Sequence, residues 1–281
     1  MRALTILLLP LLAACGDDFL PASYLADLRV LAVEATPLEV GPGEPVTLRP
    51  VLHLPAGEQL TLQRWTFCPF SLGSSAGFRC ALPACETTLT VAADGSVTAQ
   101  PSVLAGACAA KLGAGAGPGA PTLEELPEST ETVFSGTYRS SAGTARETVM
   151  RLPLYLTGPP AGRNRPPAIT RVTLGGQSLQ AGTPFRAVQP DEELELGVEV
   201  DPASLDAFVD EAGRQRTEEA LISFFTTAGR FEYDREAGTS VTNTFKAEKL
   251  EAGQTEALIY VVARDLRGGQ TVAGPFTVPI Q

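Results

Sequence analysis

The chain has 281 residues and carries 32 acidic against 21 basic side chains, which gives a net charge of −11 at pH 7. This acidic balance disfavours nucleic acids and anionic lipid head groups as partners, because phosphate binding depends on lysine and arginine. His53 is the only histidine in the sequence, which excludes most histidine-centred metal sites and nearly all nucleophile–histidine arrangements.

Residues 1–14 have the three parts of a secretory signal. Arg2 supplies a positive charge, residues 3–12 form a short apolar run, and Ala13-Ala14 provides the small residues of a cleavage site. A helix that spans a bilayer needs about 20 apolar residues, so this run is too short to be a transmembrane anchor.

The cysteine that follows the signal indicates lipid attachment. Leu12-Ala13-Ala14-Cys15 resembles the lipobox of bacterial lipoproteins. The resemblance implies that the Cys15 thiol is acylated and becomes the mature N-terminus, and two or more acyl chains give stable membrane binding. Gly16, in place of an aspartate, favours the outer membrane as the destination. The alternative is an ordinary secretory signal with an unmodified Cys15.

The other cysteines predict disulfides. An even number of cysteines in an exported chain is typical of a disulfide framework, and their spacing lacks the CxxC pairs of structural zinc sites. Four cysteines allow three pairings, and the sequence does not choose among them. These residues are Cys68, Cys80, Cys85 and Cys108.

Residues 15–26 are expected to be a short tether, and residues 27–157 a first β-sandwich. Short alternating strands with turn signals every 8 to 12 residues are typical of this architecture. The Asp94-Gly95 pair predicts a hairpin between two of the strands. The expected strands cover residues 28–35, 45–52, 60–67, 87–91, 97–100, 132–138 and 147–156.

Two insertions interrupt the first sandwich. The segment from Cys68 to Cys85 is a loop held by cysteines, and residues 105–121 are a low-complexity run of small residues that predicts a flexible segment. A disulfide-closed loop of this kind more often stabilises the fold than binds a ligand, but it is the most distinctive segment of the chain.

Residues 158–167 form a proline-rich linker, and residues 168–281 are expected to be a second sandwich. Paired prolines stiffen a linker, so the two sandwiches are expected to be held apart. Residues 206–220 are predicted to form a short crossing helix. The expected strands cover residues 169–174, 193–200, 221–226, 241–246, 257–264 and 272–280.

This layout resembles the tandem immunoglobulin-like domains of bacterial surface lipoproteins. The segments that carry the resemblance are VLAVEATPLEVGPGEPVTLRPVL and QRWTFCP in the first domain, and PPAITRVTLGGQ, FFTTAGRFE and LIYVVARDLRGGQ in the second. The resemblance implies an all-β fold of two immunoglobulin-like sandwiches after a lipoprotein signal, with Trp65 as a core residue. The cysteines depart from the usual inter-sheet pair, and the second domain has none. The resemblance therefore implies the topology and not the disulfide positions.

No segment points to catalysis, a cofactor or a metal. The acidic clusters lack the spacing of an EF-hand, so solvated loops are the first interpretation and loop-bound calcium the alternative. A glycosidase needs two facing carboxylates, but 32 acidic residues always supply some pair, so their presence indicates nothing.

Three aromatic residues are candidate partner contacts. Phe70 and Phe78 lie on the cysteine loop, and Phe225 follows Phe224 in an expected strand, so that one of the two points outward. His53, near a strand end, is expected at the surface.

The resulting hypothesis is a lipid-anchored protein of the outer membrane that acts as a non-catalytic structural or protein-interaction module, with a protein partner in an envelope or secretion assembly. The alternative is a carbohydrate-binding lipoprotein, which predicts that Phe70 and Phe78 form an exposed aromatic pair.

Overall fold

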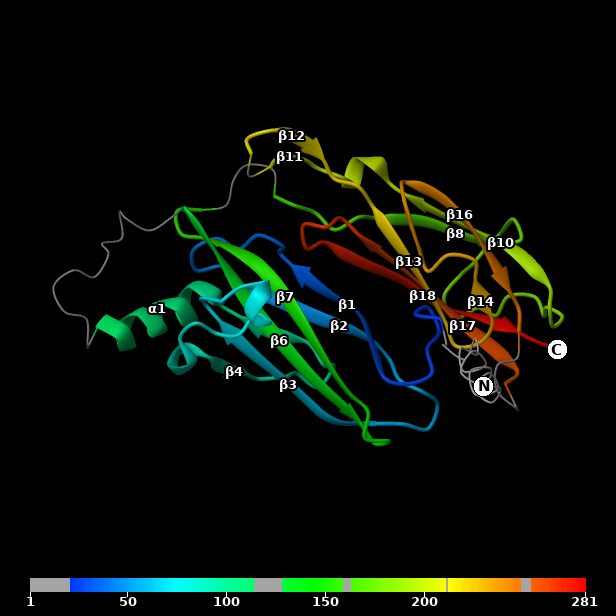
Figure 1. The fold of residues 1–281 in the computed structure, drawn as a ribbon, viewed down its shortest axis with the longest axis horizontal. Coiled ribbons are helices and arrows are strands. Elements are labelled where there is room, and N and C mark those ends of the chain that lie inside the picture. The colour runs from blue at the N-terminus through cyan, green and yellow to red at the C-terminus, as the bar shows by residue number, and fades with distance from the viewer. Residues whose placement is uncertain (1–20, 114–127, 159–162, 211, 249–253) are drawn as a thin grey trace, which may run out of the picture.

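The computed structural model describes residues 21–113, 128–158, 163–210, 212–248 and 254–281 (Figure 1). These residues form two β-sandwiches with separate hydrophobic cores. The predicted all-β class of two immunoglobulin-like sandwiches is therefore confirmed. The signal, Cys15 and Gly16 lie outside the described residues.

The first sandwich has a three-stranded and a four-stranded sheet. The order in the first is β1-β2-β5, and in the second β4-β3-β6-β7. All pairs of neighbouring strands are antiparallel. The strands are β1 (Arg29–Thr36), β2 (Val46–His53), β3 (Leu60–Cys68), β4 (Thr87–Leu89), β5 (Val97–Ala99), β6 (Ser129–Ser140) and β7 (Ala145–Tyr155).

The second sandwich repeats this arrangement with additional short strands. One sheet has the order β14-β16-β10-β8-β9, the other β15-β13-β17-β18, and β11 and β12 form a separate hairpin. The strands are β8 (Ile169–Leu174), β9 (Gln177–Ser178), β10 (Glu193–Val200), β11 (Ala207–Val209), β12 (Gln215–Thr217), β13 (Leu221–Thr226), β14 (Arg230–Phe231), β15 (Arg235–Ala237), β16 (Ser240–Lys246), β17 (Glu256–Arg264) and β18 (Gln270–Pro279).

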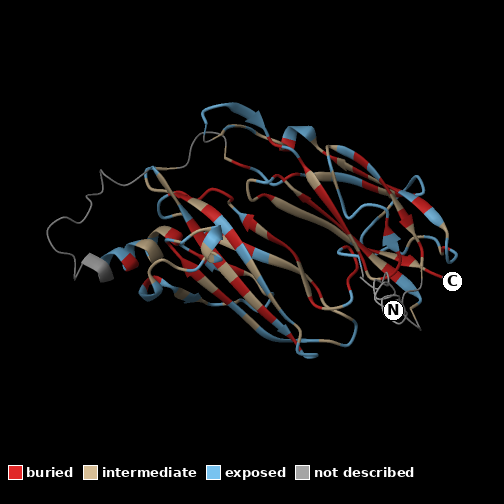
Figure 2. Cartoon of the chain, viewed as in Figure 1, coloured by how far each residue is buried: buried red, intermediate tan, exposed pale blue. Residues whose placement is uncertain are grey.

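Alternating side chains build both cores. In β10 the apolar residue of each pair is buried and the intervening residue is exposed or half-buried, as the period of two dictates (Figure 2). Trp65 of β3 is fully buried, as predicted, and its ring lies edge-on to Tyr138 of β6 with ring centroids 6.2 Å apart.

The predicted hairpin forms around Asp94-Gly95 as far as an antiparallel bridge between Val91 and Val97, but the pairing does not continue along the two strands. Ala92 N–H donates to Ser96 O at 2.8 Å, yet β4 pairs with β3 while β5 pairs with β2. The turn therefore carries the chain from one sheet of the sandwich to the other, a crossing that the local pattern of residues does not encode.

Two other local predictions are corrected. Part of the low-complexity run is helical, because α1 (Pro101–Gly113) begins at a proline and is rich in alanine, the strongest helix former. The expected helix at residues 206–220 is instead the β11–β12 hairpin. There the Asp210 carboxylate accepts hydrogen bonds from the backbone N–H groups of Ala212 and Arg214 at 3.0 and 2.9 Å, a side-chain turn that competes with helix formation.

The sandwiches are in contact rather than held apart. Leu31 and Ala32 of β1 point away from their own core and are buried against Tyr260 and Val262 of β17, together with Leu25. The spacing expected from the proline-rich linker is therefore not observed, because apolar side chains on the outer face of each sandwich cover one another.

Arginine side chains add polar contacts to this junction. The Arg264 guanidinium of the second sandwich donates to Leu31 O at 2.6 Å. Arg267 lies between two buried carboxylates, donating to Glu39 of the first sandwich at 3.1 Å and to Glu218 of the second at 2.7 Å. Burial raises the pKa of Glu218.

His53 is also part of the junction. The side chain was expected at the surface, but the residue is 4% exposed and lies edge-on to Tyr260, with 5.9 Å between ring centroids. The second sandwich covers it, which the sequence of the first does not reveal. Burial holds its pKa below the usual value of 6.5, against the opposing effect of Asp27 and Glu58.

Loss of the Arg267 guanidinium should destabilise the junction. We expect Arg267→Met to lower the free energy of unfolding by about 3 kcal/mol, because it leaves buried carboxylates without their cation. Arg171→Met is the matched control: its ion pair with Glu199 is exposed on both sides, and its removal should cost less than about 1 kcal/mol. Urea denaturation measures both. Equal losses in the two variants would contradict the role assigned to Arg267.

Acidification should weaken the contact at His53. The pKa of His53 is depressed in the folded state, so below about pH 6.5 the unfolded chain binds the proton more readily than the folded protein. The free energy of unfolding therefore decreases as the pH is lowered. Glu218, whose pKa is raised, acts in the opposite direction. We therefore compare His53→Gln with the wild type at pH 7.5 and 5.5. The variant should lose less stability on acidification; an unchanged pH dependence would refute this contribution.

Candidate functional site at the cysteine-stapled end

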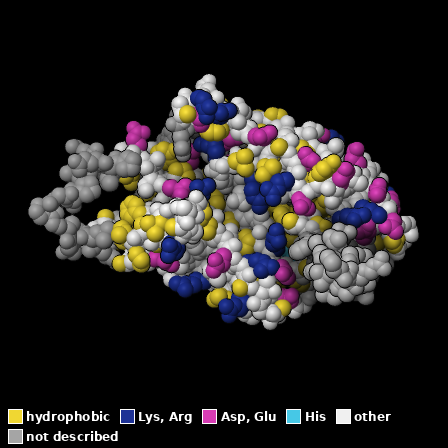
Figure 3. Space-filling model, in the orientation of Figure 1, with side chains coloured by type: hydrophobic (Ala, Val, Ile, Leu, Met, Phe, Trp, Pro, Cys, Tyr) yellow, Lys and Arg dark blue, Asp and Glu magenta, His cyan; other side chains and the backbone are white. Residues whose placement is uncertain are grey.

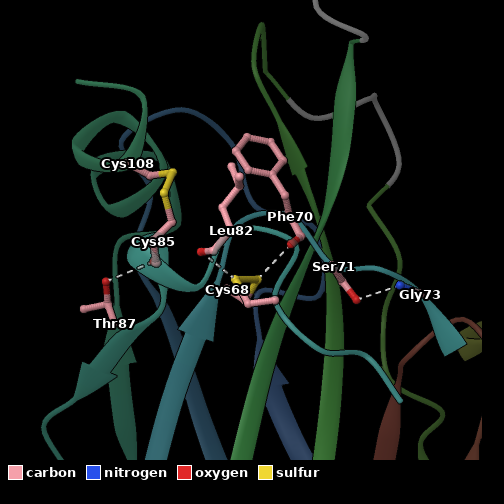
Figure 4. The surroundings of a disulfide bond; sticks show 9 residues. Cys68, Phe70, Ser71, Gly73, Leu82, Cys85, Thr87 and Cys108 are labelled. Carbon is pink, nitrogen blue, oxygen red and sulfur yellow. Dashed lines mark hydrogen bonds between the residues drawn. A yellow bond between two sulfur atoms is a disulfide. The ribbon is translucent and has the colours of Figure 1, made fainter. Parts of the chain in front are cut away.

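Two disulfides staple one end of the first sandwich (Figure 4). Cys68 is bonded to Cys80 and Cys85 to Cys108, with Cα atoms 5.5 and 5.0 Å apart. Of the three pairings that the sequence allows, the structure has the one that joins neighbouring cysteines. The first disulfide closes a loop at the end of β3, and the second ties α1 to the turn that precedes β4.

The loop between Cys68 and Cys80 folds back on itself. Leu72 N–H donates to Arg79 O at 2.9 Å, and Ala81 N–H donates to Phe70 O at 2.8 Å. At the tip of the loop, Phe78 has a φ of 55°, a conformation that is rare for bulky residues. The hydrogen bonds and the disulfide hold the loop in one shape, so its side chains are presented in a fixed arrangement.

The three predicted contact residues have different surroundings. Phe70 is 37% exposed at the end of the sandwich. Phe78 is half-buried, and the Arg151 guanidinium of β7 lies 5.4 Å from the centre of its ring. Phe225 is partly buried at the junction, where Arg29 lies 5.8 Å from its ring, so it contacts the other sandwich of the same chain. No ring contact joins Phe70 to Phe78 within the described residues.

Two further apolar side chains are exposed on the segments that the disulfides hold. Leu72 on the loop is 53% exposed and Val103 on α1 is 56% exposed. Figure 3 shows hydrophobic side chains gathered on the end of the first sandwich that carries α1. We call Phe70, Leu72 and Val103 the end patch. Water-exposed apolar groups on a rigid support favour contact with another apolar surface.

Beside the end patch, the loop roofs a groove on the outer face of the four-stranded sheet. The groove has a volume of about 260 Å³ and is lined by Phe78 and by hydroxyl and charged side chains of the sheet and the loop. Its charged residues are Arg64, Arg79, Glu86 and Glu147. Within the part of the chain that the structure describes, none of these four forms an ion pair. Arg64 donates to Thr88 Oγ1 at 3.4 Å and Arg79 to Ala76 O at 3.1 Å, and their other N–H groups can contact a ligand.

The arrangement is suited to binding. His53, the only histidine, is buried at the sandwich junction against Tyr260 and does not line the groove. Among the described residues, no group of histidine, cysteine, aspartate or glutamate is placed to hold a metal ion. The groove offers aromatic, hydroxyl and charged groups for recognition.

Sequence reasoning identified the loop but missed most of the groove. Arg64 of β3 and Glu147 of β7 are on the outer face of strands that alternate polar and apolar residues. A charged side chain at such a position is expected in any exposed strand, so the sequence does not indicate that a loop covers it. The only signal was the cluster of cysteines, which marked the loop as an ordered segment.

Comparisons with known proteins do not place the chain in a family. No family model matches it, and no curated protein does. Similar solved structures include fibronectin(III)-like modules of CbhA from Clostridium thermocellum, with 10% identity, a TM-score of 0.24, and coverage of 90% of this chain and 92% of that one. A protein from Corynebacterium diphtheriae described as membrane anchored has 10% identity and a TM-score of 0.24, with coverage of 90% and 59%. At these TM-scores the likeness carries no argument about function, and the fold is established by the strand order.

Removing each disulfide should release a different segment. We expect Cys68→Ala with Cys80→Ala to increase amide hydrogen exchange in residues 70–82 and leave α1 protected. Cys85→Ala with Cys108→Ala should do the reverse. Each loss should cost about 3 kcal/mol of stability from the greater freedom of the unfolded chain. Hydrogen exchange with mass spectrometry distinguishes the two; exchange that rises equally in both segments in both variants would contradict independent staples.

Proposed function

We propose that the protein is a lipid-anchored, non-catalytic binding module of the cell envelope, which holds a protein partner at the end patch. The observation that carries the proposal is the exposure of three apolar side chains on a loop and a helix that are each fixed by a disulfide. A rigid surface loses little conformational freedom on binding, so more of the contact energy appears as affinity.

The proposed anchor is Cys15, supported by the Leu12-Ala13-Ala14-Cys15 sequence. Among the described residues, no helix is long and apolar enough to cross a bilayer. The outer membrane is the proposed destination because glycine, rather than aspartate, follows the cysteine. The partner would be a component of an envelope or secretion assembly.

A carbohydrate ligand is the second candidate function, and the groove favours it. A sugar could stack against Phe78 and bridge Arg64 and Glu147, which lack ion-pair partners among the described residues. The two functions use different residues, so they can be tested separately.

The test compares three double variants of the native lipidated protein. The end-patch variant is Phe70→Ser with Leu72→Ser, and the groove variant is Arg64→Ala with Phe78→Ser. The control is Leu60→Ser with Leu62→Ser, which replaces leucines of similar exposure, 37 and 38%, at the opposite end of β3. Thermal unfolding establishes that each variant is folded.

Crosslinking in membranes and binding to envelope polysaccharides are then measured. We expect a specific crosslinked protein to be reduced at least tenfold in the end-patch variant and retained in the other two. Polysaccharide binding that only the groove variant loses would establish the carbohydrate function instead. A crosslinked protein retained by all three variants would refute the end patch as its site.

A further inference from the structure

We propose that residues 21–25 are a clamp that holds the second sandwich near the bilayer, so that the cysteine-stapled end points away from it. The proposal rests on acylation of Cys15 and adds an orientation to the proposed function. Chain order alone would place only the first sandwich next to the anchor, whereas the clamp also holds the second sandwich there.

The clamp is formed by strand pairing on the second sandwich. Tyr24 forms a parallel bridge with Thr226 at the end of β13. Leu25 N–H donates to Thr226 O at 2.8 Å, and Thr226 N–H donates to Ser23 O at 2.9 Å. These residues belong to the segment expected to be a tether, yet they pair with a strand 200 positions later in the chain.

Burial reinforces these hydrogen bonds. Ser23, Tyr24 and Leu25 are 1, 7 and 4% exposed, and Leu25 packs in the apolar cluster at the junction with Tyr260 and Val262. Opening the clamp would expose this apolar surface and leave backbone groups without their partners, which opposes release. Figure 1 shows the start of the described chain, in blue, lying beside β17.

The covalent chain limits how far the clamp can lie from the membrane. Six residue steps separate Cys15 from Pro21, and six steps span at most about 20 Å whatever their conformation. An acylated Cys15 at the bilayer surface therefore keeps the clamped end of the second sandwich within this distance.

The cysteine-stapled end lies farther away. Arg146, near the start of β7, forms a 2.7 Å ion pair with Asp27, which places that end of the four-stranded sheet beside the clamp. Arg146 lies level with Gln63 of β3, and the disulfide loop begins after Cys68, about five residues or about 17 Å farther along that strand. The junction contacts of Arg264 and Arg267 fix the first sandwich to the second, so the loop keeps its place relative to the clamp.

The experiment measures two distances from the membrane in the full lipidated protein. In one protein a fluorescent amino acid replaces the exposed Thr255, whose neighbour Gln254 donates to the backbone of Thr227, the residue after the clamped Thr226. In a second protein it replaces Ser75, which is exposed in the cysteine loop. Energy transfer to acceptor lipids in phosphatidylethanolamine–phosphatidylglycerol vesicles is compared. We expect the signal from Thr255 to exceed that from Ser75 several-fold.

Two variants test the cause of this difference. Leu25→Asp opens the clamp and lengthens the free leash to about 45 Å, so the ratio of the two signals should fall toward one. Leu266→Asp, at a leucine that is 67% exposed, is the control and should leave the ratio unchanged. Insertion of twelve Gly-Ser residues after Leu20 lengthens the leash without altering any described residue, and it should also lower the ratio.

The outcomes separate the orientation from the anchor. Failure of the protein to float with the vesicles overturns the acylation of Cys15, and the orientation with it. Flotation with a Ser75 signal equal to or greater than the Thr255 signal overturns the orientation alone. A ratio unchanged by the Gly-Ser insertion also overturns it, because the short leash would then not be its cause.

Discussion

The contact between β1 and β17 is the constraint on which the rest of the structure depends. Each strand is apolar on both faces: one face fills the core of its own sandwich, and the other covers the neighbouring sandwich. Neighbouring domains of one chain usually move relative to each other, because the interfaces between them are small and polar. Here the buried Leu31, Tyr260 and Val262, with the arginine contacts beside them, make the relative position of the sandwiches a property of the fold.

This rigidity gives the two ends of the molecule different roles. The clamp at residues 21–25 joins the junction to the start of the described chain. The disulfides order the opposite end of the first sandwich, where Phe70, Leu72 and Val103 remain exposed. A covalent staple supplies there the order that packing supplies at the junction, since a small loop cannot bury enough surface to fix its own shape.

Much of the fold was predictable, since strand alternation is a local property. Residues 193–200 were expected as a strand, and their alternating apolar side chains, Leu194, Leu196, Val198 and Val200, are all buried in β10. The uninterrupted apolar run Leu258–Val262 also indicates the junction, because such a run is typical of a strand that is covered on both faces. The burial of His53, the clamp and the roof over the groove all depend on contacts between distant segments, which no local pattern encodes.

The distribution of charge separates the parts that stabilise the structure from the part suited to binding. At the junction, buried Glu39 and Glu218 share the guanidinium of Arg267, and two carboxylates around one cation are tolerable only where hydrogen bonds hold each of them. In the groove, Arg64 and Glu147 form no such pair among the described residues, although the chain is rich in acids that could neutralise an arginine. An exposed ion pair contributes little to stability, so leaving these charges apart costs the fold little. The Glu147 carboxylate and the N–H groups of Arg64 other than the one that donates to Thr88 can then contact a ligand beneath the stapled loop.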